Sequence, residues 1–266
     1  VIGLLYGICR DLFGRAYSQF VILPPGRGAF VGENFTVKNK VSSSMEMYNE
    51  FFVQYDRATL PQEGDAKVDK DIIAMMQSLI NGQLITEKDK QYFILRNGEK
   101  ISLTAAASSI KEISPLLFLI KNRSAYISSV CMEEPEAHLH PAMQVKVADL
   151  IASYFNKGNF FQITTHSDYF LSRLNHLIKL GAIKKRNENK FKVLCKRLNI
   201  PEMAVLDKEM IAAYFFERDD EGKVRIQSLD VSNHGIPFST FYKVVMQQQK
   251  DDETLEKELF ELEEGE

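Results

Sequence analysis

The chain has 266 residues, of which 45% are hydrophobic, and its formal net charge is -3. This length and apolar content suffice for one large domain or for a domain with an insertion. The small net charge excludes a strong overall attraction to nucleic acid or anionic membranes, and no apolar run approaches the roughly 18 residues of a membrane span. Cys9, Cys131 and Cys195 are scattered and odd in number, which fits neither a disulfide framework nor a zinc knuckle. We therefore expect a cytoplasmic protein.

The N-terminal third is predicted to contain a helix, a short strand and a polar segment. Residues 1–18 carry apolar side chains at helical spacing. Phe20–Leu23 is an apolar run that Pro24, Pro25 and Gly26 stop, which indicates a short buried strand. The sequence then becomes polar, with helical patterns over 44–55 and 70–79. We interpret residues 37–91 as a helical insertion.

The central part predicts a hairpin followed by alternating strands and helices. The hairpin covers residues 92–103 and turns at Asn97-Gly98, the strongest short hairpin signal. The elements expected after it are a helix over 109–121, a strand ending on Glu133-Glu134, a helix from Pro141, a strand ending on His166 and a helix over 168–180. This order favours parallel βαβ units. The predicted fold class is α/β, with a mostly parallel sheet flanked by helices.

The C-terminal part predicts a basic stretch, a second hairpin and an acidic end. Lysines and arginines cluster between Lys184 and Arg197. They could track a nucleic-acid backbone, or they could be a solvated linker; no interleaved aromatic residues support stacking on bases. Residues 210–216 and 224–229 flank Asp219–Gly222 as a hairpin, and residues 251–266 form an acidic helix or a frayed tail.

Two carboxylates at a predicted strand end are the strongest functional signal. Glu133 and Glu134 follow an apolar run, and the next apolar run ends on His166. The carboxyl ends of parallel strands meet at one edge of a sheet, where open α/β sheets bind ligands. Neighbouring strand residues point to opposite sides, so one carboxylate is expected near a metal and the other near a water.

The string Val130–Pro141, VCMEEPEAHLHP, resembles the Walker B segment of ABC-type ATPases. Within these ATPases the string resembles one branch, the AAA-15/AAA-21 ATPases and the overcoming-lysogenization-defect family, which implies a P-loop NTPase fold that binds ATP and Mg²⁺. In that family, Glu133 would serve Mg²⁺, which takes carboxylate partners. Glu134 would be the base that polarises the attacking water. His166 would sense the γ-phosphate as the switch histidine.

The same resemblance places serines opposite a partner subunit. The segment Leu103–Lys111 occupies the position of the ABC signature motif, whose serine and backbone N–H groups reach the partner's γ-phosphate. Aligned from Ile110, Ser108 matches the family serine and Ser109 replaces a glycine. On the residues alone, this is an ordinary serine N-cap.

Two further positions follow from the resemblance. His140 lies in the segment that crosses the dimer interface in the family, the D-loop. Leu23–Gly28 resembles the family's Leu-Pro-Ala-x-Arg segment, which assigns Arg27 to the nucleotide site or the interface. A turn with a solvated arginine is the alternative for Arg27. A transition-metal site is the alternative for His138 and His140, because His-x-His binds zinc or manganese when a third ligand converges. The candidate third ligands are Glu133, Glu136 and His166.

The sequence lacks the G-x-x-x-x-G-K-[ST] phosphate loop that holds the nucleotide in such proteins. In the family this loop precedes all the matched segments, and Val1 is not an initiator methionine, so the simplest interpretation is that the Walker A lobe is absent from this chain. A naturally incomplete ATPase is the other interpretation. The expected domains are a partial ABC-type core over 1–36 and 92–246, the insertion over 37–91 and an acidic tail over 247–266.

The resemblance implies an ATPase that dimerises head to tail on ATP and controls a partner effector. In relatives the effector is often a nuclease, in DNA-related or anti-phage defence systems; the chain shows no Toprim pattern, so a separate effector is expected. A transporter-type ATPase would need a Leu-Ser-Gly-Gly-Gln signature and an Asp-Glu pair, and neither is present. A non-catalytic, nucleotide-sensing scaffold with the same fold is the alternative from another class, and a His/Glu metal hydrolase is a third.

Overall fold

The computed structural model describes residues 19–31, 48, 51–55, 69–88, 90–123, 128–218, 221–237 and 239–264. The chain divides into two compact units, Val1–Leu206 and Asp207–Glu266, and each is described by itself. The helix predicted over 1–18 lies outside the described residues. Of the helix predicted over 44–55, residues 48 and 51–55 are described and are helical.

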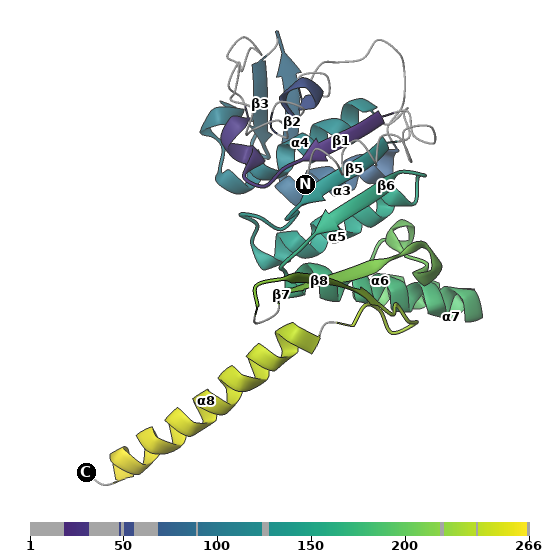
Figure 1. Cartoon of the computed structure of the whole chain (residues 1–266). Helices are drawn as coiled ribbons and strands as arrows, with labels where there is room; N and C mark the ends of the chain where they lie inside the picture. Colours follow the sequence, from purple (N-terminus) through teal and green to yellow (C-terminus); the bar gives the residue numbers. More distant parts are fainter. Residues whose placement is uncertain are drawn as a thin grey trace. The chain divides into compact units, whose positions relative to one another are not determined.

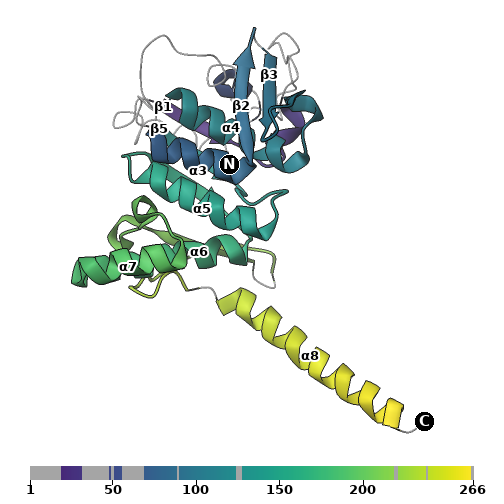
Figure 2. The ribbon, with the colours of Figure 1, turned by 180° about the vertical axis from the view of Figure 1, so that it is seen from behind.

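A parallel three-stranded sheet organises the larger unit. Its strands are β1 (Gln19–Leu23), β5 (Ser128–Glu133) and β6 (Phe160–Thr164), in the order β1-β5-β6. The helix α5 (Pro141–Phe155) connects β5 to β6, and it lies with α3 (Lys70–Ile80) on one face of the sheet (Figures 1 and 2). The predicted parallel βαβ unit is confirmed.

Local signals explain where α5 begins. Pro141 occupies the first turn, where its missing N–H costs no helical hydrogen bond, and His140 is the N-cap. The apolar face of α5 is buried and consists of Val147, Leu150, Ile151 and Tyr154. This face packs α5 into the unit and so fixes the loop that precedes it.

A small antiparallel sheet lies beside this core and contains one strand that the sequence did not predict. Its strands are β2 (Gly82–Glu87), β3 (Lys90–Leu95) and β4 (Lys100–Ser102). The predicted hairpin is β3–β4, with Gly98 at φ 84° in its turn. The strand β2 lies within the segment interpreted as a helical insertion, of which α3 is the confirmed helix.

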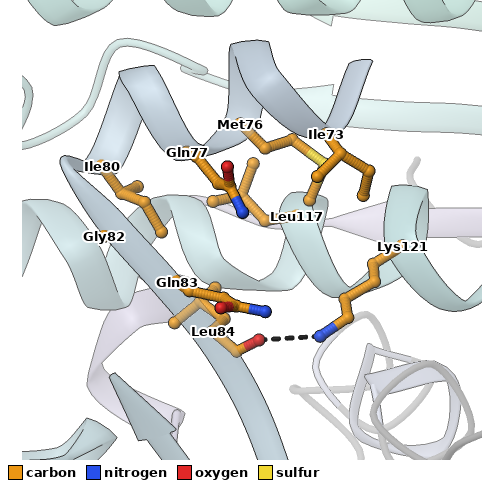
Figure 3. A pocket seen from close by; sticks show the side chains of 9 residues that line it. All are labelled: Ile73, Met76, Gln77, Ile80, Gly82, Gln83, Leu84, Leu117 and Lys121. Carbon is orange, nitrogen blue, oxygen red and sulfur yellow. Dashed lines mark hydrogen bonds between the residues drawn. The ribbon is translucent and has the colours of Figure 1, made fainter. Parts of the chain in front are cut away.

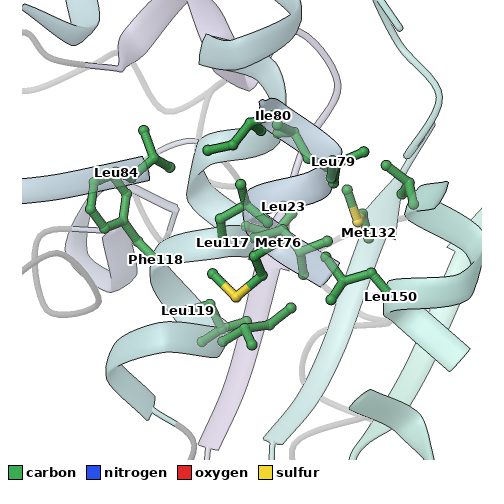
Figure 4. Close-up of a cluster of buried hydrophobic side chains, with 14 of the residues drawn as sticks. Leu23, Met76, Leu79, Ile80, Leu84, Leu117, Phe118, Leu119, Met132 and Leu150 are labelled. Atoms are coloured by element: carbon green, nitrogen blue, oxygen red, sulfur yellow. The ribbon is translucent and has the colours of Figure 1, made fainter. Parts of the chain in front are cut away.

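The core of the larger unit gathers side chains from both the parallel sheet and its helices. The helix α4 (Ser108–Arg123) contributes a continuous buried run, Leu116–Ile120. Figure 4 shows these side chains meeting residues of β1, α3, β5 and α5, among them Leu23, Met76, Met132 and Leu150. This packing holds the ends of the strands in fixed positions.

The basic stretch is helical rather than an extended linker. It spans the end of α6 (Asp168–Arg186) and most of α7 (Glu188–Leu198). The reason is that Phe191 and Cys195, one helical turn apart, are buried, while the lysines of α7 face solvent.

The smaller unit contains the predicted second hairpin, formed by β7 (Ala213–Arg218) and β8 (Val224–Leu229). Its other main element is the helix α8 (Ser239–Glu264), so the boundary expected at residue 247 falls inside one helix. Across the described residues, no helix combines the length and the apolar character needed to cross a membrane.

Candidate functional site

The acid pair lies at the carboxyl end of β5, beside the end of β6. Glu133 is the last residue of β5 and aligns with Thr164, the last residue of β6. Beyond the strand, the backbone N–H of Glu134 donates a hydrogen bond of 3.0 Å to the carbonyl oxygen of Thr164. The two carboxylates and the segment Thr165–His166 therefore occupy one edge of the sheet, as predicted from the ends of the apolar runs.

The expectation that the pair points to opposite sides of a strand is wrong for Glu134. Its φ is 44°, in the left-handed region, so the strand stops before it. A non-glycine residue there costs on the order of 1–3 kcal/mol, and such strain persists only where surrounding contacts fix it. A hydrogen bond of 3.0 Å from the N–H of Ala137 to the carbonyl oxygen of Glu134 closes the turn that starts at Glu134.

Charge at this edge is unevenly distributed. Burial raises the pKa of Glu133, and the negative charge of Glu134 raises this pKa further, while the positive charge of Arg27 lowers it. Both carboxyl groups are half-buried. A carboxylate whose ionised form is disfavoured in this way gains from a nearby cation, and oxygen ligands are those that Mg²⁺ takes. The chemistry of the donor set at Glu133 thus fits Mg²⁺.

Glu136 connects the turn after β5 to the loop after β6. The sequence suggested Glu136 only as a possible ligand of the alternative metal site, and this structural link was not predicted. Its Oε1 accepts hydrogen bonds from the Thr165 hydroxyl, at 2.9 Å, and from the His166 backbone N–H, at 2.7 Å. Its Oε2 is buried and accepts no hydrogen bond from any described residue. Glu136 stands two residues after the acid pair, but its partners lie about 30 residues away, so no local pattern identified its role.

His166 is exposed, and its backbone is fixed by Glu136. The next residue, Ser167, is the N-cap of α6, and its hydroxyl accepts from the N–H of Phe170 at 3.1 Å. The imidazole is therefore presented to solvent at the sheet edge from a loop that is held at both ends.

The other histidines of this edge have different placements. His140 is exposed, and its Nδ1 accepts a hydrogen bond of 3.2 Å from the N–H of Ala142 at the start of α5. His138 is exposed with φ 58°. Within the described ranges, no three His, Cys, Asp or Glu side chains come together as a metal site. The histidine-based metal hypothesis therefore gains no geometric support there.

Ser108 and Ser109 form the first turn of α4. Ser108 is exposed and Ser109 is half-buried. Between the described residues, no hydrogen bond joins these serines to Glu133 or Glu134 in the same chain. Glu112, one turn further along α4, is buried, and its carboxylate forms an ion pair with Arg27.

Arg27 begins the 3-10 helix η1 (Arg27–Phe30), which follows β1, and its side chain is fully buried. The alternative of a solvated arginine in a turn is therefore wrong. One guanidinium nitrogen, NH1, donates to the carbonyl oxygen of Glu133 at 2.8 Å, and NH2 donates to that of Glu134 at 3.4 Å. The guanidinium thus contacts the backbone of the acid pair.

A hollow of about 30 Å³ lies away from these residues, between α3, β2 and the middle of α4 (Figure 3). Its lining is mostly apolar. Lys121 crosses its rim and donates a hydrogen bond of 2.8 Å to the carbonyl oxygen of Leu84. Burial lowers the pKa of Lys121. None of the predicted site residues lines this hollow.

Comparison with known proteins gives one family match and several weak structural ones. The sequence model of the family AAA_15, described as "AAA ATPase domain", matches residues 36–171. No curated protein matches the sequence. A solved SMC ATPase, from work on ATP-driven dimerization and DNA-stimulated activation, is similar with a TM-score of 0.40 and 13% identity, over 76% of this chain and 96% of that one. An Smc head domain with coiled coil and joint from Pyrococcus yayanosii has a TM-score of 0.40 and 14% identity, over 77% of this chain and 32% of that one.

Proposed function

Since the chain belongs to the AAA_15 family of AAA ATPase domains, we propose that it supplies one part of an ATP-hydrolysing site that two protomers share. Its fold is the α/β, P-loop NTPase-like arrangement of a parallel sheet with helices, as the sequence predicted. ATP is the nucleotide that the family implies. The finer assignments below concern the residues, the dimer and the partner.

The observation that carries the proposal is the joined end of β5 and β6. Glu133 and Glu134 meet His166 at one edge, and the hydrogen bonds of Glu134 and Glu136 tie the two strand ends together. Catalysis of phosphoryl transfer depends mainly on such positioning and on charge stabilisation. A half-buried acid pair fixed beside an exposed histidine has the parts that this chemistry needs.

Each residue then has a distinct task. Glu133 holds Mg²⁺, which when bound neutralises charge that develops on the phosphate oxygens. Glu134 accepts a proton from the attacking water and orients it. His166 donates a hydrogen bond to the γ-phosphate, because an imidazole ring carries at least one N–H donor in either protonation state. The exposure of His166 leaves its ring accessible to a ligand.

The remaining predicted residues act across the dimer. Ser108 and Ser109 are proposed to contact the γ-phosphate bound by the partner protomer, because the first turn of a helix offers unpaired N–H groups and a positive dipole end. The exposure of Ser108 supports this role. His140 lies in the loop proposed to cross the interface, and its capping bond to α5 would orient that loop.

The phosphate cradle is proposed to come from a segment outside these residues, because the 266 residues contain no phosphate-loop motif. ATP-driven closure of two protomers would then control a separate effector, for which a nuclease in DNA-related or anti-phage defence is our candidate. The exposed lysines of α7 are proposed to contact the phosphate backbone of a nucleic acid directly.

The experiment compares the full-length protein with its Glu134→Gln variant in Mg-ATP turnover and Mg-ATP binding. The variant should lose turnover by on the order of a hundredfold or more while still binding Mg-ATP, because it removes only the proton acceptor. Glu202→Gln, which changes an exposed carboxylate on the 3-10 helix η4 (Glu202–Ala204), is the control and should keep turnover. Unchanged turnover in Glu134→Gln would sink the assignment. Mg-ATP binding without turnover in the full-length protein would favour the non-catalytic, nucleotide-sensing scaffold, and absence of any Mg-ATP affinity would contradict the proposed ATPase.

A further inference from the structure

Arg27 has an unusual placement for an arginine. Among the described residues it is the largest fully buried side chain, and it follows the turn that ends β1. An unpaired guanidinium in such a place would cost several kcal/mol. Burial accordingly lowers the pKa of Arg27, and four carboxylates, those of Glu112, Glu136, Glu134 and Glu133, oppose that effect in this order.

The donors of Arg27 bind backbone oxygens from three parts of the fold. Nε donates to the carbonyl of Glu112 on α4 at 3.0 Å. NH1 donates to the carbonyl of Pro24, after β1, at 3.0 Å and to that of Glu133 at 2.8 Å. NH2 donates to the carbonyl of Glu134 at 3.4 Å. A planar guanidinium can address several oxygens at once, whereas a lysine ammonium is a single point charge.

The carbonyls of Glu133 and Glu134 lie where the ladder of β5 ends and the chain enters the left-handed turn at Glu134. Two donors from one rigid group fix both peptide planes at this point. Because the backbone dihedrals decide which directions the side chains can take, Arg27 constrains the two carboxylates without touching them.

Close packing of η1 against α4, at Gly28 and Glu112, holds Arg27 in place; we call this contact the close joint. Glu112 is buried, and its Oε1 lies 3.5 Å from NH1 of Arg27. Its Oε2 accepts a hydrogen bond of 2.8 Å from the N–H of Gly28. A Cβ on Gly28 would lie 2.8 Å from the backbone nitrogen of Glu112 and 3.0 Å from its Cα, so only glycine permits this approach. The acid pair is thereby connected to the helix that begins with Ser108 and Ser109.

We propose that Arg27 is a positioning residue that sets the backbone of Glu133 and Glu134 from inside the core and joins it to α4. The inference rests on the proposed ATPase function for its kinetic consequence only. It differs from the sequence expectation that Arg27 binds the nucleotide or the interface, because the guanidinium is fully buried and its donors bind main-chain oxygens. Loss of Arg27 should then slow the chemical step and leave nucleotide affinity unchanged.

The test uses Arg27→Lys in the full-length protein, with Arg173→Lys as the matched control. Arg173 is also a nearly buried arginine of the larger unit: it forms two hydrogen bonds of 2.7 Å with Asp149, between α6 and α5. Both variants keep the charge and lose the planar fork, so both should lower the thermal midpoint. Only the Arg27 variant should affect the acid pair.

The first readout is amide hydrogen exchange of the segment 133–139, which needs no activity. Exchange at the N–H groups of Glu134 and Ala137 should become faster in Arg27→Lys and stay unchanged in Arg173→Lys, because only the first variant releases that turn. Equal exchange rates of this segment in the two variants would overturn the proposal, whether or not the protein hydrolyses ATP. An inactive wild type with faster exchange in Arg27→Lys would instead contradict the proposed function alone.

The second readout is the split between kcat and KM for Mg-ATP. Arg27→Lys should lower kcat by on the order of tenfold or more, because misplacement of reacting groups is costly, while KM stays within about twofold. Arg173→Lys should keep kcat. A rise in KM with kcat unchanged would mean that Arg27 contacts the nucleotide, and the proposal would be wrong.

Discussion

Gly181→Ala is a substitution for which two physical effects compete and the structure decides the sign. Gly181 is buried in the interior of α6, where alanine is normally favoured by about 1 kcal/mol through helix propensity. A Cβ at this position, however, would lie 2.0 Å from the carbonyl oxygen of Leu206. Such a contact with backbone cannot exist, so the segment ending at Leu206 must move away from α6.

That movement is opposed by several contacts. The N–H of Leu206 donates to the carbonyl of Leu177 at 3.3 Å. The side-chain amide of Asn156 donates to the carbonyls of Met203 and Val205, each at 2.8 Å. Overpacking costs about 1–3 kcal/mol, and each hydrogen bond that breaks costs about 0.5–1.5 kcal/mol. Set against the propensity gain of about 1 kcal/mol, the net loss of unfolding free energy should be about 2 kcal/mol.

The assay is denaturant and thermal unfolding followed by circular dichroism. A loss of about 2 kcal/mol in a unit of this size lowers the thermal midpoint by about 4–8 °C. Asn189→Ala is the control, because Asn189 is exposed on α7 and only propensity acts there; it should be neutral or slightly stabilising. A Gly181→Ala protein as stable as the wild type, or more stable, would refute the packing of Leu206 against α6.

Two further predictions concern the core of the larger unit. Gly28→Ala should lower the unfolding free energy by about 1–3 kcal/mol, because its Cβ would force η1 away from the backbone of Glu112; a denaturation midpoint equal to that of the wild type would contradict the close joint. Burial lowers the pKa of Lys121 in the folded protein below its pKa in the unfolded chain. Between these two pKa values the unfolded chain binds more protons than the folded protein, so the free energy of unfolding should rise with pH through that interval. Lys121→Met should lack this rise in urea unfolding measured from pH 7 to pH 10, and an identical pH slope in both proteins would show that Lys121 is not buried in solution.

The sequence was sufficient where one local pattern determined the structure. The apolar runs before Glu133 and His166 predicted two strands whose ends meet, and Pro141 marked the start of the helix between them. Asn97-Gly98 predicted the β3–β4 turn. These patterns need no knowledge of distant residues, because strand burial, helix capping and turn geometry depend on near neighbours.

The sequence was insufficient where the cause lies far along the chain. No turn dipeptide joins β2 to β3, since the link is Lys88-Asp89, and β2 itself shows no regular alternation of apolar and polar residues. It becomes a strand because β3 pairs with it. A buried arginine and a solvated one read alike in sequence, and the partners of Arg27 on α4 and β5 lie 85 to 107 residues away. The same holds for Glu136, whose role depends on the loop after β6.

The charges at the sheet edge give the site a physical reason to require a cation. Four carboxylates, those of Glu112, Glu133, Glu134 and Glu136, surround the single guanidinium of Arg27. Arg27 and Glu112 are paired inside the core, so the other three carboxylates lie at the end of β5 and on the turn after it, which is the edge of the proposed site. A triphosphate brought to this edge alone would meet like charge, which costs binding energy most strongly where water is partly excluded. A divalent ion at Glu133 changes the sign of that interaction, and the helix N-terminus of a partner's α4 would add further positive potential. The same imbalance that disfavours the empty acid pair would therefore favour closure of two protomers around a metal-bound nucleotide.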